Sequence, residues 1–175
     1  RIGIVEFSEF QCPFCAKFAA ETMPTLTQKY VDSGLVRFAF RNLPLESIHQ
    51  YAFSAGQLAE CANDQGRFWE VHAAFFQQPT AKTGQDFKTR ALAAGLDASK
   101  LDRCLARDDA TERIRTDMKL AESLQLTSTP AFLIGRIENT GLLATQVILG
   151  ARPTTEFVQA IESVLQASAR SGEPK

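Results

Sequence analysis

Two cysteines with two residues between them, Cys12 and Cys15, are the feature of the sequence that most clearly predicts chemistry. An apolar run typical of a strand, residues 2–7, precedes them, and Phe18 and Thr22 follow at the spacing of a helix. A Cys-x-x-Cys placed where a strand gives way to a helix is a redox site more often than a metal site. We therefore predict that these two thiols form and open a disulfide.

The start of the predicted helix explains how Cys12 would react. The first backbone N–H groups of a helix have no carbonyl partners, and the helix dipole adds partial positive charge there. A thiolate at this position is stabilised, so Cys12 should ionise more readily than a free cysteine. Pro13 fits the first helical position, where a missing N–H costs nothing. Cys15 lies about one turn further along the helix, within reach of Cys12.

Strand patterns occur only near the two ends of the chain. A helix is expected at 15–32, bent near Pro24, and residues 35–41 then alternate as a strand does. This order indicates a βαβ unit with parallel strands. Near the C-terminus, strands are expected at 131–135 and 146–150 as a hairpin, before a helix opened by Pro153.

The middle of the chain has a different sequence pattern. Residues 47–126 contain almost no β-branched runs and are typical of consecutive helices. These helices are expected at 47–62, 68–76, 86–94, 99–106 and 109–124. The sequence therefore predicts an α/β fold with a helical insertion.

Four segments give the sequence a resemblance to a known family. They are residues 10–15 (FQCPFC), 36–45 (VRFAFRNLPL), 65–70 (QGRFWE) and 127–132 (TSTPAF). Together with the order of elements they resemble the DsbA-like thiol–disulfide oxidoreductases of the bacterial cell envelope. The third segment is similar to the Gln-Gly-x-Phe-Trp pattern of the branch that includes Gram-positive homologues. The resemblance implies a thioredoxin-like fold with an inserted all-helical domain.

The domain boundaries follow from this resemblance. Residues 1–43 and 127–170 would form a discontinuous thioredoxin-like domain, and residues 44–126 the helical insertion domain. Residues 171–175 would be a polar tail. Because the sequence starts within a strand, we expect a mature or trimmed form whose signal or anchor segment lies outside it.

The same resemblance implies roles for individual residues. Cys12 would be the attacking thiol and Cys15 the resolving one. Pro130 would be a cis-proline facing the pair, with Thr129 before it, and both would contact substrate. Pro13 and Phe14, between the two cysteines, are also expected to contact substrate.

Phe14 stands where the best-known DsbA type has a histidine, and it supplies neither charge nor a polar hydrogen. We therefore expect the pKa of Cys12 to be lowered, but less than the ~3.5 of that type. Thioredoxin-like proteins keep a buried acid beneath the disulfide, and Glu6 lies six positions before Cys12. A buried carboxyl has a raised pKa and could take the proton of Cys15. Glu9 is a competing acid in the same segment.

The other cysteines and the histidines have structural interpretations. Cys61 and Cys104 both fall in the insertion, where we expect a structural disulfide, because an oxidising compartment leaves few thiols free. The alternative is two buried thiols that act as small apolar side chains. His49 and His72 are interpreted as structural or surface residues. The chain offers too few closely spaced ligands for a metal site.

Composition limits the function classes. The 175 residues carry 19 basic and 20 acidic side chains, so neither a nucleic acid nor a membrane surface is indicated as a partner. The apolar runs are far shorter than the ~20 residues of a membrane helix. We expect a monomeric enzyme without cofactor or metal.

The predicted function is oxidation of cysteine pairs in folding envelope proteins, by exchange through a Cys12–Cys15 disulfide. The expected location is the periplasm or another extracytoplasmic space. The partners would be unfolded or folding cysteine-containing proteins and a membrane or soluble redox partner that resets the disulfide. Two alternatives stay open: a reductase or isomerase that uses the same site, and a peptide-binding, chaperone-like module with incidental cysteines.

Overall fold

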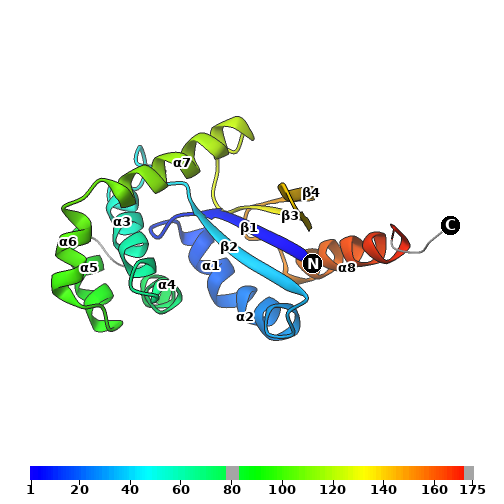
Figure 1. The fold of residues 1–175 in the computed structure, drawn as a ribbon, viewed down its shortest axis with the longest axis horizontal. Coiled ribbons are helices and arrows are strands. Elements are labelled where there is room, and N and C mark those ends of the chain that lie inside the picture. The colour runs from blue at the N-terminus through cyan, green and yellow to red at the C-terminus, as the bar shows by residue number, and fades with distance from the viewer. Residues whose placement is uncertain (78–82, 172–175) are drawn as a thin grey trace.

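The computed structural model describes residues 1–77 and 83–171, and it has a sheet at its centre with helices around it (Figure 1). The sheet contains four strands in the order β2-β1-β3-β4. The strands are β1 (Ile2–Ser8), β2 (Val36–Asn42), β3 (Ala131–Glu138) and β4 (Gly141–Leu149). β1 runs parallel to β2 and antiparallel to β3, and β3 and β4 form the predicted hairpin.

The helices fall into two groups. Those packed on the sheet near the chain ends are α1 (Pro13–Glu21), α2 (Met23–Leu26) and α8 (Thr154–Ser171). Those inserted between β2 and β3 are α3 (Ala52–Asn63), α4 (Phe68–Gln77), α5 (Gly84–Ala93), α6 (Ala98–Leu105) and α7 (Asp109–Ser123). Figure 1 shows α3 to α6 gathered at one end of the molecule and α8 at the other. The α/β architecture with a helical insert was predicted correctly.

The alternation of β1 decides which side chains lie under α1. Successive side chains of a strand point to opposite faces, so Ile2, Ile4 and Glu6 share one face. Ile2 and Ile4 pack there in one cluster with Phe18 of α1 and Phe157 of α8. Glu6 therefore points toward the face that α1 covers.

The opposite face of β1 meets the end of the insertion, where Phe7 packs against Ala121 of α7. A polar network fixes the same junction. Asp117 of α7 is almost fully buried and accepts hydrogen bonds from the Arg41 side chain at 2.8 Å and from the backbone N–H of Asn42 at 2.9 Å. Asn42 also donates to Glu60 of α3 at 2.8 Å. The end of β2 is thus held by two helices of the insertion.

Several boundaries differ from those expected. The first helix begins at Pro13 and ends at Glu21, and α2 and a π-helical turn, Thr27–Val31, replace its second half. Proline lacks the N–H that a continuous helix needs, and Pro24 stands at the start of α2. α3 begins at Ala52, so the helix expected from residue 47 was wrong for residues 47–51.

The hairpin strands are also longer than expected. The pairing continues through residues 136–138 and 141–145, with a register shift between Ile134 and Gly135. A Cβ at Gly135 would overlap the backbone of Leu143, so glycine permits this close approach rather than ending the strand. At the C-terminus, Ser171 of the predicted tail is the last residue of α8, and residues 172–175 lie outside the described residues. Within the described ranges, no helix is both long and apolar enough to cross a membrane.

Candidate active site

Cys12 lies at the junction between the sheet and the first helix. It is the N-cap residue of α1, with φ −70° and ψ 120°, and Pro13 occupies the first turn. The backbone N–H of Cys15 points back to the Cys12 sulfur at 3.4 Å. Pro13 and Phe14 are exposed, Phe14 by 61%, whereas Cys12 is only 4% exposed. The two thiols are not bonded to each other.

The surroundings of Cys12 favour its thiolate. The hydrogen bond from the Cys15 side chain has the largest effect on the pKa of Cys12, and burial opposes it. With the Thr129 side chain and the backbone N–H groups of Cys15 and Phe14, it lowers that pKa to about 6. A helix end that offers free N–H groups acts in this direction. At neutral pH the Cys12 sulfur is therefore mainly a nucleophilic thiolate.

Cys15 has the opposite preference. It is fully buried, and burial followed by the hydrogen bond to Cys12 and the nearby charges of Cys12 and Glu6 raises its pKa well above the ordinary range. A thiol in this state is protonated at neutral pH and unreactive. The pair thus contains one ionised and one protonated sulfur.

Glu6 is buried beneath this pair. It is 1% exposed, and neither carboxyl oxygen has a hydrogen-bond partner among the residues that the structure describes. Burial, opposed by the Ser8 side chain and with a smaller contribution from the charge of Cys12, raises the pKa of Glu6 to about 8. Its carboxyl is therefore protonated at neutral pH and carries a proton that it can donate.

A distant segment completes the site. Thr129 and Pro130 follow the insertion, and the peptide bond between them is cis. The Thr129 carbonyl oxygen lies 3.5 Å from the Cys12 sulfur, across 117 positions of sequence, and accepts a hydrogen bond from it when Cys12 is a protonated thiol. The fold therefore brings together Cys12, Cys15, Glu6 and Thr129, with Pro130 adjacent in the chain.

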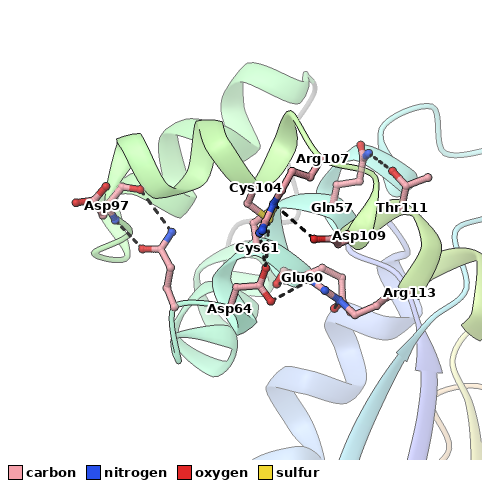
Figure 2. Close-up of a disulfide and its surroundings, with 11 residues drawn as sticks. Gln57, Glu60, Cys61, Asp64, Asp97, Cys104, Arg107, Asp109, Thr111 and Arg113 are labelled. Atoms are coloured by element: carbon pink, nitrogen blue, oxygen red, sulfur yellow. Dashed lines mark hydrogen bonds and ion pairs between the residues drawn. A yellow bond between two sulfur atoms is a disulfide. The ribbon is translucent and has the colours of Figure 1, made fainter.

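Cys61 and Cys104 form a disulfide that joins α3 to α6, with their Cα atoms 5.8 Å apart (Figure 2). Both residues are buried, and charged side chains lie around them. Asp64 is paired with Arg113 at 3.1 Å and with Arg107 at 3.8 Å. The bridge is separate from the Cys12–Cys15 site and holds the insertion.

In the described part of the chain, no group of three or more histidine, cysteine or acidic side chains is placed to hold a metal ion.

Comparison with known proteins identifies the family of the chain. The model of the thioredoxin family matches residues 2–142, most of the chain. The chain belongs to the thioredoxin family. Among the proteins that it resembles are solved DsbA structures and a probable disulfide bond formation protein.

Three relatives place the protein more closely. Over 133 residues it is 31% identical to the Na(+)/H(+) antiporter NhaA 3 of Salinispora tropica, which covers 76% of this chain and 20% of the antiporter. The chain thus spans about a fifth of the length of the antiporters that it matches. It is 25% identical over 147 residues to the probable disulfide bond formation protein D of Bacillus anthracis, covering 79% of this chain and 67% of that protein.

The third is a crystal structure, that of Wolbachia pipientis alpha-DsbA1. The alignment covers 98% of this chain and 89% of the Wolbachia chain, with a TM-score of 0.85 and 20% sequence identity. This likeness confirms the thioredoxin-like fold with a helical insert that the sequence predicted.

Residues that no local sequence pattern points to also lie at this site. The segment before α3 lies against the active-site loop. The Gln11 side chain accepts a hydrogen bond from the backbone N–H of Tyr51 at 2.6 Å, and His49 is paired with Glu9. The interpretation of His49 as a structural or surface residue therefore missed its position beside Glu9. The residue is 40 positions from Glu9, so no local pattern could reveal this contact.

Proposed function

We propose that this thioredoxin-family protein oxidises cysteine pairs of folding proteins outside the cytoplasm, by exchange through a Cys12–Cys15 disulfide. The observation that carries the proposal is the asymmetry of the two thiols. The pKa of Cys12 is lowered to about 6, while that of Cys15 is raised well above its ordinary range. A stable Cys12 thiolate favours the reduced enzyme, and a stable reduced form makes the disulfide an oxidant.

The reaction has two exchange steps. A substrate thiolate attacks the Cys12 sulfur, the Cys12–Cys15 bond breaks, and Cys15 leaves with the electron pair. The buried Cys15 thiolate is unstable, and the protonated Glu6 supplies its proton. A second substrate thiolate then attacks the substrate sulfur of the mixed disulfide and releases Cys12 as a thiolate. The substrate has lost two electrons and the enzyme has gained them.

The substrate would approach over the exposed turn and the loop before Pro130. Phe14 is 61% exposed and offers an apolar contact beside the reactive sulfur. The Thr129 backbone lies at hydrogen-bond distance from that sulfur, where a substrate chain bonded to Cys12 would pass. This arrangement favours extended segments of proteins that are not yet folded.

An extracytoplasmic location is supported by the Cys61–Cys104 disulfide, because structural disulfides persist in oxidising compartments. The name of the Bacillus anthracis relative, a probable disulfide bond formation protein, agrees with an oxidising role. Each turnover leaves the enzyme reduced, so a membrane or soluble redox partner must accept its electrons.

The direction of exchange is tested by the equilibrium of the Cys12–Cys15 couple with a glutathione buffer. We expect a reduction potential between the ~−270 mV of thioredoxin and the ~−120 mV of DsbA. A value at or below that of thioredoxin would favour a reductase instead. A parallel assay follows the recovery of a reduced, unfolded substrate protein. Cys12→Ala should abolish this recovery, and unchanged recovery would point to a chaperone-like module.

A further inference from the structure

Glu9 is a buried acid that the exchange steps above do not use. It follows β1, is 2% exposed and lies in the loop that leads to Cys12. Its Oε2 accepts a hydrogen bond from the backbone N–H of Gln11 at 2.6 Å. Its Oε1 meets Nδ1 of His49, which comes from the segment before α3. Both carboxyl oxygens are thus held in place, one by the active-site loop and one by the imidazole.

The two members of this pair differ in access to water. The Glu9 side chain is 2% exposed, whereas that of His49 is 22% exposed. In the described part of the chain, His49 is the only ion-pair partner of Glu9, and no lysine or arginine reaches it. A proton that enters or leaves Glu9 therefore has a route through the imidazole.

The charge of Glu9 is linked to that of Cys12. Burial, opposed by the Gln11 N–H and His49 and aided by a charge on Cys12, raises the pKa of Glu9 to about 7. The titratable groups around Glu9 are His49 and Cys12, and those around Cys12 also include Cys15 and Glu6. In this buried setting a carboxylate and a thiolate repel each other, so a negative charge on one raises the pKa of the other.

We propose that Glu9 and His49 form a redox-linked proton site, which takes up a proton when Cys12 becomes a thiolate and releases it when the Cys12–Cys15 disulfide forms. The inference rests on thiol–disulfide exchange at that pair. A substrate dithiol gives up two electrons and two protons. Cys15 binds one proton, and the Glu9–His49 pair holds the other, which would otherwise pass to water. The pair thereby offsets the negative charge that reduction leaves on Cys12.

The pH dependence of the redox equilibrium tests this proposal. Each further proton bound on reduction changes the equilibrium constant tenfold per pH unit, which equals 29.6 mV for two electrons. Near pH 7 the equilibrium constant of the wild type should vary with pH by roughly three- to tenfold more per unit than that of Glu9→Gln. Glutamine keeps an oxygen that can accept the Gln11 N–H but cannot bind the proton. Equal slopes in the two proteins would overturn the proposal.

His49→Gln tests the imidazole separately. Because His49 lowers the pKa of Glu9, its removal should move the steep part of the pH dependence to higher pH. If the pH dependence of His49→Gln coincides with that of the wild type, His49 is not part of the proton site. Glu70→Gln is the matched control, because Glu70 is an exposed acid on α4, paired with Arg67 just before that helix, and its replacement should leave the slope unchanged.

A direct proton count separates this inference from the proposed function. A water-soluble phosphine reduces the disulfide without any protein substrate, and water supplies the oxygen and two protons. In a weakly buffered solution near pH 7, Glu9→Gln should release up to one more proton per molecule than the wild type. Proton uptake or release by groups that the two proteins share cancels when the proton release of one is subtracted from that of the other. Equal proton release overturns the inference even if exchange occurs, and a clear difference supports it even if the physiological direction is reduction.

Discussion

The backbone N–H of Cys15 lies 3.4 Å from the sulfur of Cys12, so the second residue of the pair stabilises a negative charge on the first. The Cys15 side chain contributes the largest effect on the pKa of Cys12. Burial, together with the same proximity, raises the pKa of Cys15 and keeps it protonated. One short loop thus gives two chemically identical side chains different protonation states.

Removal of the Cys15 side chain should raise the pKa of Cys12 above about 6. A hydrogen bond to a charged group contributes roughly 1.5–3 kcal/mol, which corresponds to about one to two pKa units. Ultraviolet absorbance of the thiolate, followed across pH, measures the change in Cys15→Ala. Cys15→Ser keeps a donor and should lie between Cys15→Ala and the wild type. A Cys12 pKa in Cys15→Ala at or below the wild-type value would contradict this account.

Glu6→Gln should stabilise the reduced protein more at alkaline than at acidic pH. The pKa of Glu6 is raised from 4.5 to about 8, so the folded state binds the proton more tightly than the unfolded state. Wild-type stability from this group is present below pH 4.5 and is lost as the pH rises toward 8. Across that window the loss is at most about 5 kcal/mol, at ~1.4 kcal/mol per unit.

Urea unfolding of the reduced wild type and of Glu6→Gln at a series of pH values measures this loss. Glu9 contributes a slope of the same sign, and the comparison of the two proteins cancels it. If the difference between their unfolding free energies does not change with pH, Glu6 has no raised pKa.

Replacement of both Cys61 and Cys104 by alanine should destabilise the protein. The bridge closes a loop of 43 positions, for which chain entropy gives about 4 kcal/mol of stabilisation. Thermal unfolding of the double variant measures the loss. Thiolate absorbance serves as the control, because the pKa of Cys12 should remain about 6. An unchanged unfolding temperature would show that the bridge does not stabilise the fold.

His72→Leu should reduce the sensitivity of the protein to acid. His72 packs among aromatic rings, and its ring centroid lies 4.8 Å from that of Phe76 and 5.5 Å from that of Phe40. Burial lowers the pKa of His72 from 6.5 to about 4. Its contribution to stability is present above pH 6.5 and is lost as the pH falls toward 4. The loss is at most about 3 kcal/mol over this range.

Unfolding free energies of the wild type and His72→Leu, measured from pH 7 to pH 4, check this prediction. The two curves should converge, or cross, as the pH falls. Parallel curves would mean that His72 binds a proton equally well in the folded and unfolded states.

The sequence by itself determined the chemistry and the class of fold. Cys12, Pro13 and Cys15 are contiguous, so their position at a helix start followed from local pattern alone. The order of strands and helices gave the α/β architecture with a helical insert, because strand alternation and helical spacing are local properties. Boundaries were less secure. Residues 47–51 have a helical composition, yet they form an irregular segment. His49 and Tyr51 of this segment contact the active-site loop.

Only the tertiary structure decided how the charges around Cys12 are arranged. Glu6 and Glu9 were competing candidates in the sequence, and the fold buries both, one on the face of β1 that α1 covers and one against His49. Thr129 reaches the Cys12 sulfur across 117 positions. The physical reason is that burial and long-range contact set the pKa of each group, and both depend on which distant segments the fold brings together.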